Sequence, residues 1–135
     1  MGLQRRKSNE CDLAGDKVID GQLVEWIRSG IERDERYTPE DIICGIRNGN
    51  FQLFRYPKGI VITQITDHQR LLVFLISGDD FDSWKEEANL DLIAYSKALG
   101  ISVVEAYCRR GLEKSLKEIG WRTEQIVMRY RITES

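Results

Sequence analysis

Apolar residues recur with helical spacing in the first third of the chain and predict two helices. The first lies in "GQLVEWIRSGI", with Asp20 at its N-cap. The second lies in "YTPEDIICGIRNGN", where Thr38 is the N-cap and Pro39 the first helical residue. The residues that give each helix one apolar side are Leu23, Trp26 and Ile27, and then Ile42, Ile43 and Ile46.

The pattern then changes and predicts three strands. "FQLFRY" and "IVITQIT" have the composition and alternation of strands and are joined by the turn "YPKGI". The run Leu71–Ser77, "LLVFLIS", is apolar on both faces, as is typical of a central strand covered on two sides. Because the connecting turns are short, the three strands must form an antiparallel meander.

Helix and strand alternate in the last third. An apolar stripe predicts a long helix that ends at Gly100, and "ISVVEAY", Ile101–Tyr107, follows as a strand. Two strands that flank one helix form a crossover, so Leu71–Ser77 and Ile101–Tyr107 are expected to be parallel and right-handed. A short helix ending at Gly120 precedes "WRTEQIVMRYRIT", which is predicted as a long closing strand. The stripe of the long helix is Trp84, Ala88, Leu92, Tyr95 and Leu99, and the inward residues of the short helix are Leu112, Leu116 and Ile119.

The 135 residues suit one domain. Residues 1–17 are polar and aperiodic and are expected to form a flexible N-terminal arm, and 18–135 a single domain. No apolar run approaches the roughly 18 residues of a transmembrane helix, and the N-terminus lacks the hydrophobic core of a signal peptide. We therefore expect no membrane association and a cytoplasmic location.

Charge and cysteine content narrow the function classes further. The 20 basic and 22 acidic residues give a net charge of -2, which offers no electrostatic argument for nucleic acid. The three cysteines are widely spaced and form no CxxC pair. This spacing argues against a disulfide framework and against a metal site.

The turn after the central strand carries an unusual amount of acid. In "SGDDFDSWKEE", Asp79, Asp80 and Asp82 follow Gly78, and Lys85 is the only cation nearby in the sequence. A strand-to-helix turn is a common place for a phosphorylated cofactor, but three carboxylates would repel a pyrophosphate. We expect these acids to cap the helix and complement its dipole instead.

The order of elements, with "LKEIGW" before the last strand, resembles the GNAT superfamily of acyl-CoA-dependent N-acyltransferases over roughly Gly21 to Thr133. The resemblance implies an α+β fold whose mixed central sheet combines an antiparallel meander with a parallel β-α-β crossover, with helices on both faces. In that family the strands that match Leu71–Ser77 and Ile101–Tyr107 splay apart, and the pantetheine arm of the cofactor lies between them.

Two chemical signatures of the family are missing. Its pyrophosphate-binding Gln/Arg-x-x-Gly-x-Gly/Ala turn is replaced by the acidic turn. Its catalytic tyrosine, four or five residues before the Gly-aromatic pair, would fall on Leu116 or Ser115. The ending "VEAYCRRGLEKSLKEIGW" is similar to a pattern in tailed bacteriophages, and size and ending resemble a stripped GNAT-like internal virion protein of short-tailed phages. The resemblance thus implies a non-catalytic protein with no cofactor, acting as a virion component or protein-binding module in a bacterial host cytoplasm or a virion.

Basic residues on the last helix are the candidate partner-binding surface in this reading, with other virion proteins among the possible partners. They are Arg109, Arg110, Lys114 and Lys117. Glu113 and Glu118 are interleaved with them, so a solvated helix face with local ion pairs is the simpler interpretation. Nucleic-acid binding through the same residues is a further alternative.

A divergent acetyl-CoA-dependent N-acetyltransferase is the rival hypothesis. Glu105 would then be the general base and Tyr107 the acid. Glu105 could equally be a structural carboxylate paired with an Arg or Tyr. The candidate cofactor-binding residues for acetyl-CoA are Leu75, Ile76, Ser77, Gly78 and Lys85.

Cys108 and His68 form one more hypothetical pair. Cys108 precedes two arginines, which would lower the pKa of its thiol. His68 lies in a polar hairpin turn, where a surface position explains it, and no third group that would orient it is evident.

Overall fold

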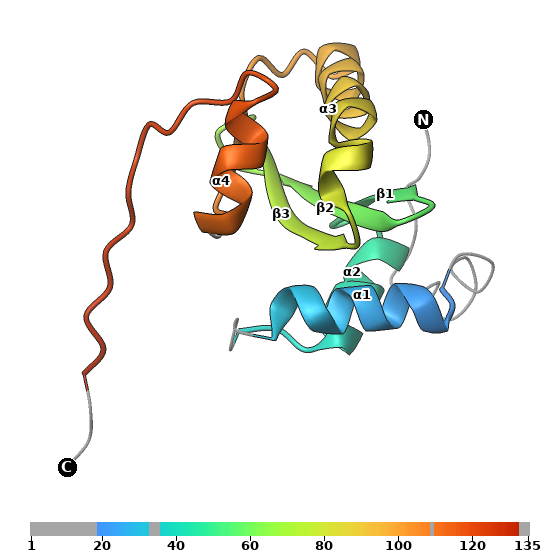
Figure 1. The fold of residues 1–135 in the computed structure, drawn as a ribbon. Helices are drawn as coiled ribbons and strands as arrows, with labels where there is room; N and C mark the ends of the chain where they lie inside the picture. Colours follow the sequence, from blue (N-terminus) through green and yellow to red (C-terminus); the bar gives the residue numbers. More distant parts are fainter. Residues whose placement is uncertain (1–18, 33–35, 109, 133–135) are drawn as a thin grey trace.

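The computed structural model describes residues 19–32, 36–108 and 110–132, and the proposed N-terminal arm lies outside them. The described chain is an α+β unit with a four-stranded mixed sheet (Figure 1). Its elements in order are α1 (Gly21–Ile31), α2 (Pro39–Arg47), β1 (Gln52–Tyr56), β2 (Gly59–Ile65), β3 (Leu71–Gly78), α3 (Phe81–Ala98), β4 (Val104–Ala106) and α4 (Arg110–Lys117).

Both predicted N-caps are confirmed. The Asp20 carboxylate accepts a 2.9 Å hydrogen bond from the Leu23 backbone N–H at the start of α1. Thr38 and Asp41 form a reciprocal capping box at the start of α2, with bonds of 3.1 and 3.0 Å. Side-chain acceptors here satisfy amides that have no partner within the helix, so local sequence is enough to predict both boundaries. The Asp20 carboxylate also accepts hydrogen bonds of 2.9 and 3.0 Å from Arg55 of β1.

The sheet order β1-β2-β3-β4 confirms the meander and the parallel crossover. β1, β2 and β3 pair antiparallel, and β4 pairs parallel with β3 through the register Leu71↔Val104 to Val73↔Ala106. β4 is shorter than the predicted strand Ile101–Tyr107, although the Val103 carbonyl still accepts a 3.1 Å hydrogen bond from the Leu71 N–H.

A β-bulge divides β3. Ile62 of β2 pairs with Leu75, and the next residue, Thr63, pairs with Val73, so Phe74 is the extra residue. The bulge shifts the alternation of side chains along the strand. Val73 packs toward α3, whereas Leu75 packs toward α1. The sequence run is apolar throughout and therefore gave no sign of this shift.

Helices cover both faces of the sheet, as predicted (Figure 1). α1 and α2 pack on one face around Ile60 and Ile62, and α3 packs on the other around Val61 and Leu71. The predicted stripe of α3 is buried at Trp84, Ala88 and Leu92, but α3 ends at Ala98 and Leu99 is 47% exposed. In α4, Leu116 is buried and Leu112 is half-buried, and Ile119 in the turn after the helix is half-buried as well.

The predicted closing strand is wrong. Residues 122–132 form no helix or strand, and all of them are exposed. The beginning of this segment is held on helices rather than beside β4, because the Trp121 indole donates a 2.9 Å hydrogen bond to Asn89 and Thr123 donates one to Glu113. Figure 1 shows the segment extending away from the body of the domain. We call residues 122–132 the C-terminal tail.

Within the described residues, none of the helices has the length and apolar character needed to cross a membrane.

Candidate functional site

The acidic turn after β3 is closed by contacts within the protein. The Asp79 N–H donates a 2.7 Å hydrogen bond to the Lys58 carbonyl, and the Trp84 indole donates one of 2.9 Å to the Asp79 carbonyl. Gly78 has φ +132°, and a Cβ there would lie 2.2 Å from the Lys58 carbonyl oxygen. The Asp79–Lys58 hydrogen bond and the close approach of Gly78 to Lys58 hold the start of α3 against the turn between β1 and β2.

The expectation that Asp80 caps α3 through its side chain is wrong. Asp80 occupies the N-cap position in the left-handed region, at φ 53°, and its side chain makes no capping hydrogen bond. Its carboxylate lies 3.3 Å from the Lys58 ammonium instead. Lys58 is therefore a second cation at the turn, and the sequence did not reveal it because 20 residues separate Lys58 from Gly78.

A phosphate bound at this turn would need a cation such as Lys85. The ammonium of Lys85 is already paired with two carboxylates. The side chain is 8% exposed, and its ammonium donates to Asp82 at 3.0 Å and to Glu118. The hydrogen bonds that Lys85 donates to Glu118 and then to Asp82 raise the pKa of Lys85. Ser115 donates a 2.7 Å hydrogen bond to Asp82, and this bond, followed by that of Lys85, lowers the pKa of the carboxyl.

These four residues tie the first turn of α3 to α4, and we call them the Lys85 cluster (Asp82, Lys85, Ser115 and Glu118). The cluster uses the charge of Lys85 inside the protein, so little of it is left for an anionic ligand. Sequence analysis missed it, since the partners are 33 residues apart in the chain. The one available signal was that Ser115, with Leu116, is one of the two positions at which the GNAT resemblance would place a tyrosine.

The strand residues proposed to bind a cofactor are committed to packing. Leu75 is buried in the core on the α1 side, and Ser77 is 8% exposed. Ile76 lines a cavity of about 10 Å³ between the sheet, α3 and α4, together with Leu116 and Trp121. That volume holds about one water molecule, whereas ligand pockets are usually several hundred Å³.

Glu105 pairs with Arg70 at 3.2 Å, with side-chain exposures of 31% and 51% for Glu105 and Arg70. This pairing with an arginine is what the interpretation of Glu105 as a structural carboxylate predicts. Tyr107 lies just beyond β4 and is 71% exposed. Glu105 is thus partly exposed and paired with Arg70, and Tyr107 is largely exposed.

The structure places His68 on the surface, in the turn between β2 and β3, as predicted. Cys108 is exposed just beyond β4, and nothing among the described residues around it supports the hypothesis of a lowered pKa. Partial desolvation, followed by the charge of Glu113, raises the pKa of the Cys108 thiol. A raised thiol pKa reduces the thiolate fraction at neutral pH, which is the opposite of what a nucleophile requires.

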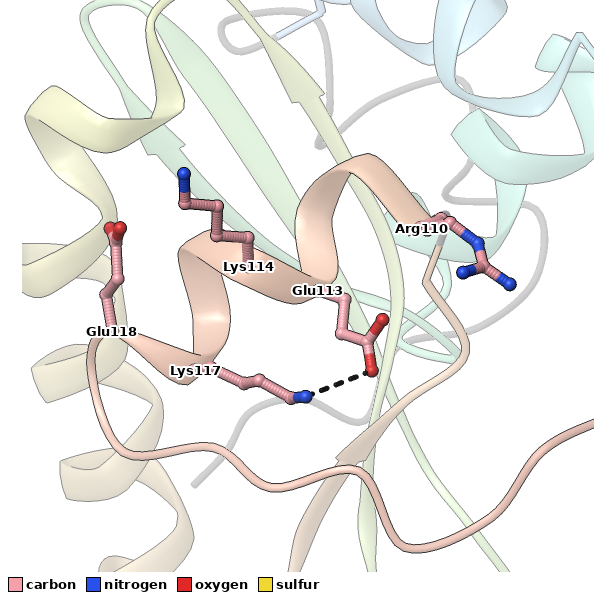
Figure 2. Close-up of a pocket in the computed structure, with 5 residues that line it drawn as sticks. All are labelled: Arg110, Glu113, Lys114, Lys117 and Glu118. Atoms are coloured by element: carbon pink, nitrogen blue, oxygen red, sulfur yellow. Dashed lines mark ion pairs between the residues drawn. The ribbon is translucent and has the colours of Figure 1, made fainter.

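Three of the predicted partner-binding residues, Arg110, Lys114 and Lys117, line a surface hollow of about 510 Å³ at α4 (Figure 2). Arg110 and Lys114 are exposed, and their side chains point apart in Figure 2. Lys117 pairs with Glu113 at 3.5 Å, as an i, i+4 pair on a helix surface. Arg109 lies outside the described residues. The surface thus mixes both signs of charge and belongs to one helix alone.

Comparison with known proteins places the chain in no family. No family model matches it, and no solved structure matches it. It is 26% identical over 78 residues to a tRNA/tmRNA (uracil-C(5))-methyltransferase from Campylobacter lari. The match covers 58% of this chain and 22% of that enzyme, so the chain spans about a fifth of the relative's length.

Proposed function

We propose that the chain is a non-catalytic protein with a GNAT-like scaffold, phage-encoded, that acts as a virion component or protein-binding module. The observation that carries the proposal is the closed acidic turn. Its backbone is bonded to Lys58, and Lys85 is neutralised by Asp82 and Glu118. A pyrophosphate site needs uncompensated positive potential, and both cations at this turn, Lys58 and Lys85, are already paired with carboxylates.

The sheet order supports the scaffold part of the proposal. A meander followed by a parallel crossover, with helices on both faces, is the layout that the family resemblance implies. The small cavity beside Ile76 supports the loss of catalysis, because a pantetheine arm does not fit in about 10 Å³. Function then resides in the surfaces of the protein.

Turnover gives the first test. The purified chain is incubated with acetyl-CoA and a panel of primary amines, and release of CoA thiol is followed with a thiol reagent. We expect a rate equal to the background without protein. Release above background that depends on both the amine and the protein would overturn the non-catalytic proposal.

The α4 surface is the partner-binding candidate in this proposal. Lys114 is exposed on the rim of the surface hollow, whereas Lys97 is exposed on α3, away from it. Once a partner protein is known, Lys114→Glu should weaken its binding by about tenfold, as expected when an interface pair becomes like-charged. Lys97→Glu adds the same charge elsewhere and should leave the affinity unchanged. Equal effects of both variants would remove α4 from the interface.

Catalysis by a divergent acetyltransferase is a second candidate, and the β-bulge at Phe74 favours it. Bulges are frequent beside active sites, where they redirect the backbone. In that case Glu105 would act as base, and Glu105→Gln would abolish the CoA release described above. Unchanged turnover in this variant would exclude Glu105 as the base.

RNA binding is a third candidate, and the partial similarity to a tRNA/tmRNA methyltransferase favours it. Arg110, Lys114 and Lys117 would then contact phosphates. The test is a titration of fluorescent tRNA at low and high salt. Three phosphate contacts would lower the affinity steeply with salt, and the absence of binding at low salt would exclude this candidate.

A further inference from the structure

The C-terminal tail has the pattern of a strand but lies in solvent. Its even-numbered positions from 126 to 132 are all large and apolar, while the odd positions include two arginines. The apolar side chains are nearly fully exposed: Ile126 82%, Met128 90%, Tyr130 91% and Ile132 83%. Alternation of this kind belongs to a strand with one buried face, and such exposure is unfavourable in water.

The same chain also carries an unused strand edge. β4 is last in the sheet order and pairs with β3 alone among the described strands. Next to it, Val103 is 40% exposed and Tyr107 is 71% exposed. Unpaired backbone groups with apolar side chains beside them are a template for another strand.

The tail does not pair with this edge in its own domain. Its start is bonded to α4 through Thr123 and Glu113, and Trp121 is bonded to Asn89 of α3. Residues 124–132 extend over about 30 Å, at roughly 3.3 Å per residue, which is enough to reach a neighbouring molecule.

We infer that the tail adds as a strand to the β4 edge of a second copy of this chain, and that the two copies exchange tails reciprocally. The donor strand (the tail) and the acceptor (the β4 edge) are present in the same chain. Reciprocal exchange therefore closes a two-fold dimer in which no tail and no β4 edge is left unpaired. The apolar face of each tail then lies against its partner, and the edge of each sheet is covered.

This inference concerns assembly and does not rest on the proposed function. It adds a class of partner, a second copy, and gives the apolar tail a role that the α4 surface does not explain. The exchanged dimer can form whether or not the protein binds CoA, so the two questions are tested separately.

The test uses the full chain. Light scattering after size exclusion should give twice the 15.7 kDa of one chain. Met128→Asp places a charge on the apolar face of the tail and should give a folded monomer. Gln125→Asp adds the same charge at the opposite parity and should remain dimeric. A monomeric wild type, or a dimer that Met128→Asp leaves intact, would overturn the inference.

Hydrogen exchange of the wild-type protein tests it without relying on the variant. Amides of residues 125–132 should be protected in the dimer, and dilution to monomer should remove that protection. Protection that persists in the monomer would indicate pairing within one chain and overturn the exchange. A dimer whose tail exchanges at the rate of free peptide would overturn it as well.

Discussion

Ser115 on α4 donates a 2.7 Å hydrogen bond to Asp82 in the first turn of α3. This bond belongs to the Lys85 cluster, which also holds the ammonium of Lys85 between Asp82 and Glu118. The cluster holds the first turns of α3 against α4, next to the acidic turn after β3. A residue position associated with catalysis in the GNAT resemblance thus contributes here to helix packing.

The Asp82–Ser115 bond predicts a pH dependence of stability. Hydrogen bonds from Ser115 and Lys85 hold the pKa of Asp82 below its ordinary value of 3.8. The stabilisation from Asp82 is therefore complete above pH 3.8 and is lost as the pH falls through the lower, folded-state pKa. Ser115→Ala should lower the melting temperature at neutral pH, and its deficit should shrink at acidic pH.

Thermal melting of wild type and Ser115→Ala from neutral to strongly acidic pH measures this difference. Ser29→Ala, at an exposed position of α1, is the matched control and should follow wild type throughout. A deficit in Ser115→Ala that stays constant across the acid range would show that Asp82 is not responsible.

Substitution of Gly78 should destabilise the protein more than substitution of a similar glycine elsewhere. An alanine Cβ at Gly78 would lie 2.2 Å from the Lys58 carbonyl oxygen, in a backbone conformation at φ +132°. We expect Gly78→Ala to cost about 2 kcal/mol or more of unfolding free energy. Gly100→Ala, at φ +74° with open space around it, should cost roughly 1 kcal/mol. Urea unfolding measures both, and equal losses would show that the turn is not closely packed.

The Arg70–Glu105 pair should contribute little to stability. Both side chains are partly exposed and lie 3.2 Å apart. A double-mutant cycle with Arg70→Met and Glu105→Gln should give a coupling of less than about 1 kcal/mol that falls further in high salt. A coupling several times larger would mean that the Glu105 side chain is more buried than the 31% exposure in the structure indicates.

Cys108 should react slowly with alkylating agents. Partial desolvation raises the pKa of its thiol, so the thiolate fraction near neutral pH is smaller than that of a free cysteine. We expect iodoacetamide to modify Cys108 more slowly than it modifies glutathione at the same pH, as measured by mass spectrometry of the Cys108 peptide. In the Cys108→Ser variant the mass-spectrometric signal of the alkylated peptide should disappear, which assigns that signal to Cys108. Modification faster than glutathione would revive the nucleophile hypothesis.

Sequence reasoning succeeded where the signal was local. The caps at Asp20 and Thr38 and the parallel crossover follow from residue types within a few positions and from the lengths of connections. The bulge at Phe74 did not follow, because an apolar run has the same pattern whichever way each side chain points. The closing strand was predicted from alternation alone, and alternation does not say which edge will pair with it.

The candidate site was predictable only in part for the same physical reason. The acidic character of the turn was visible in the sequence. The partners that neutralise the turn were not visible, because Lys58 and Glu118 reach it from distant parts of the chain. Pairing across such separations depends on packing, which sequence pattern does not encode directly.

Calorimetric titration of the purified protein with acetyl-CoA, and separately with free CoA, tests the central claim most directly. If the acidic turn is closed and Lys85 is already neutralised, neither ligand should give saturable heat. Neither should raise the melting temperature at millimolar concentration. One-site binding with a dissociation constant in the micromolar range would contradict the account and establish a working cofactor site.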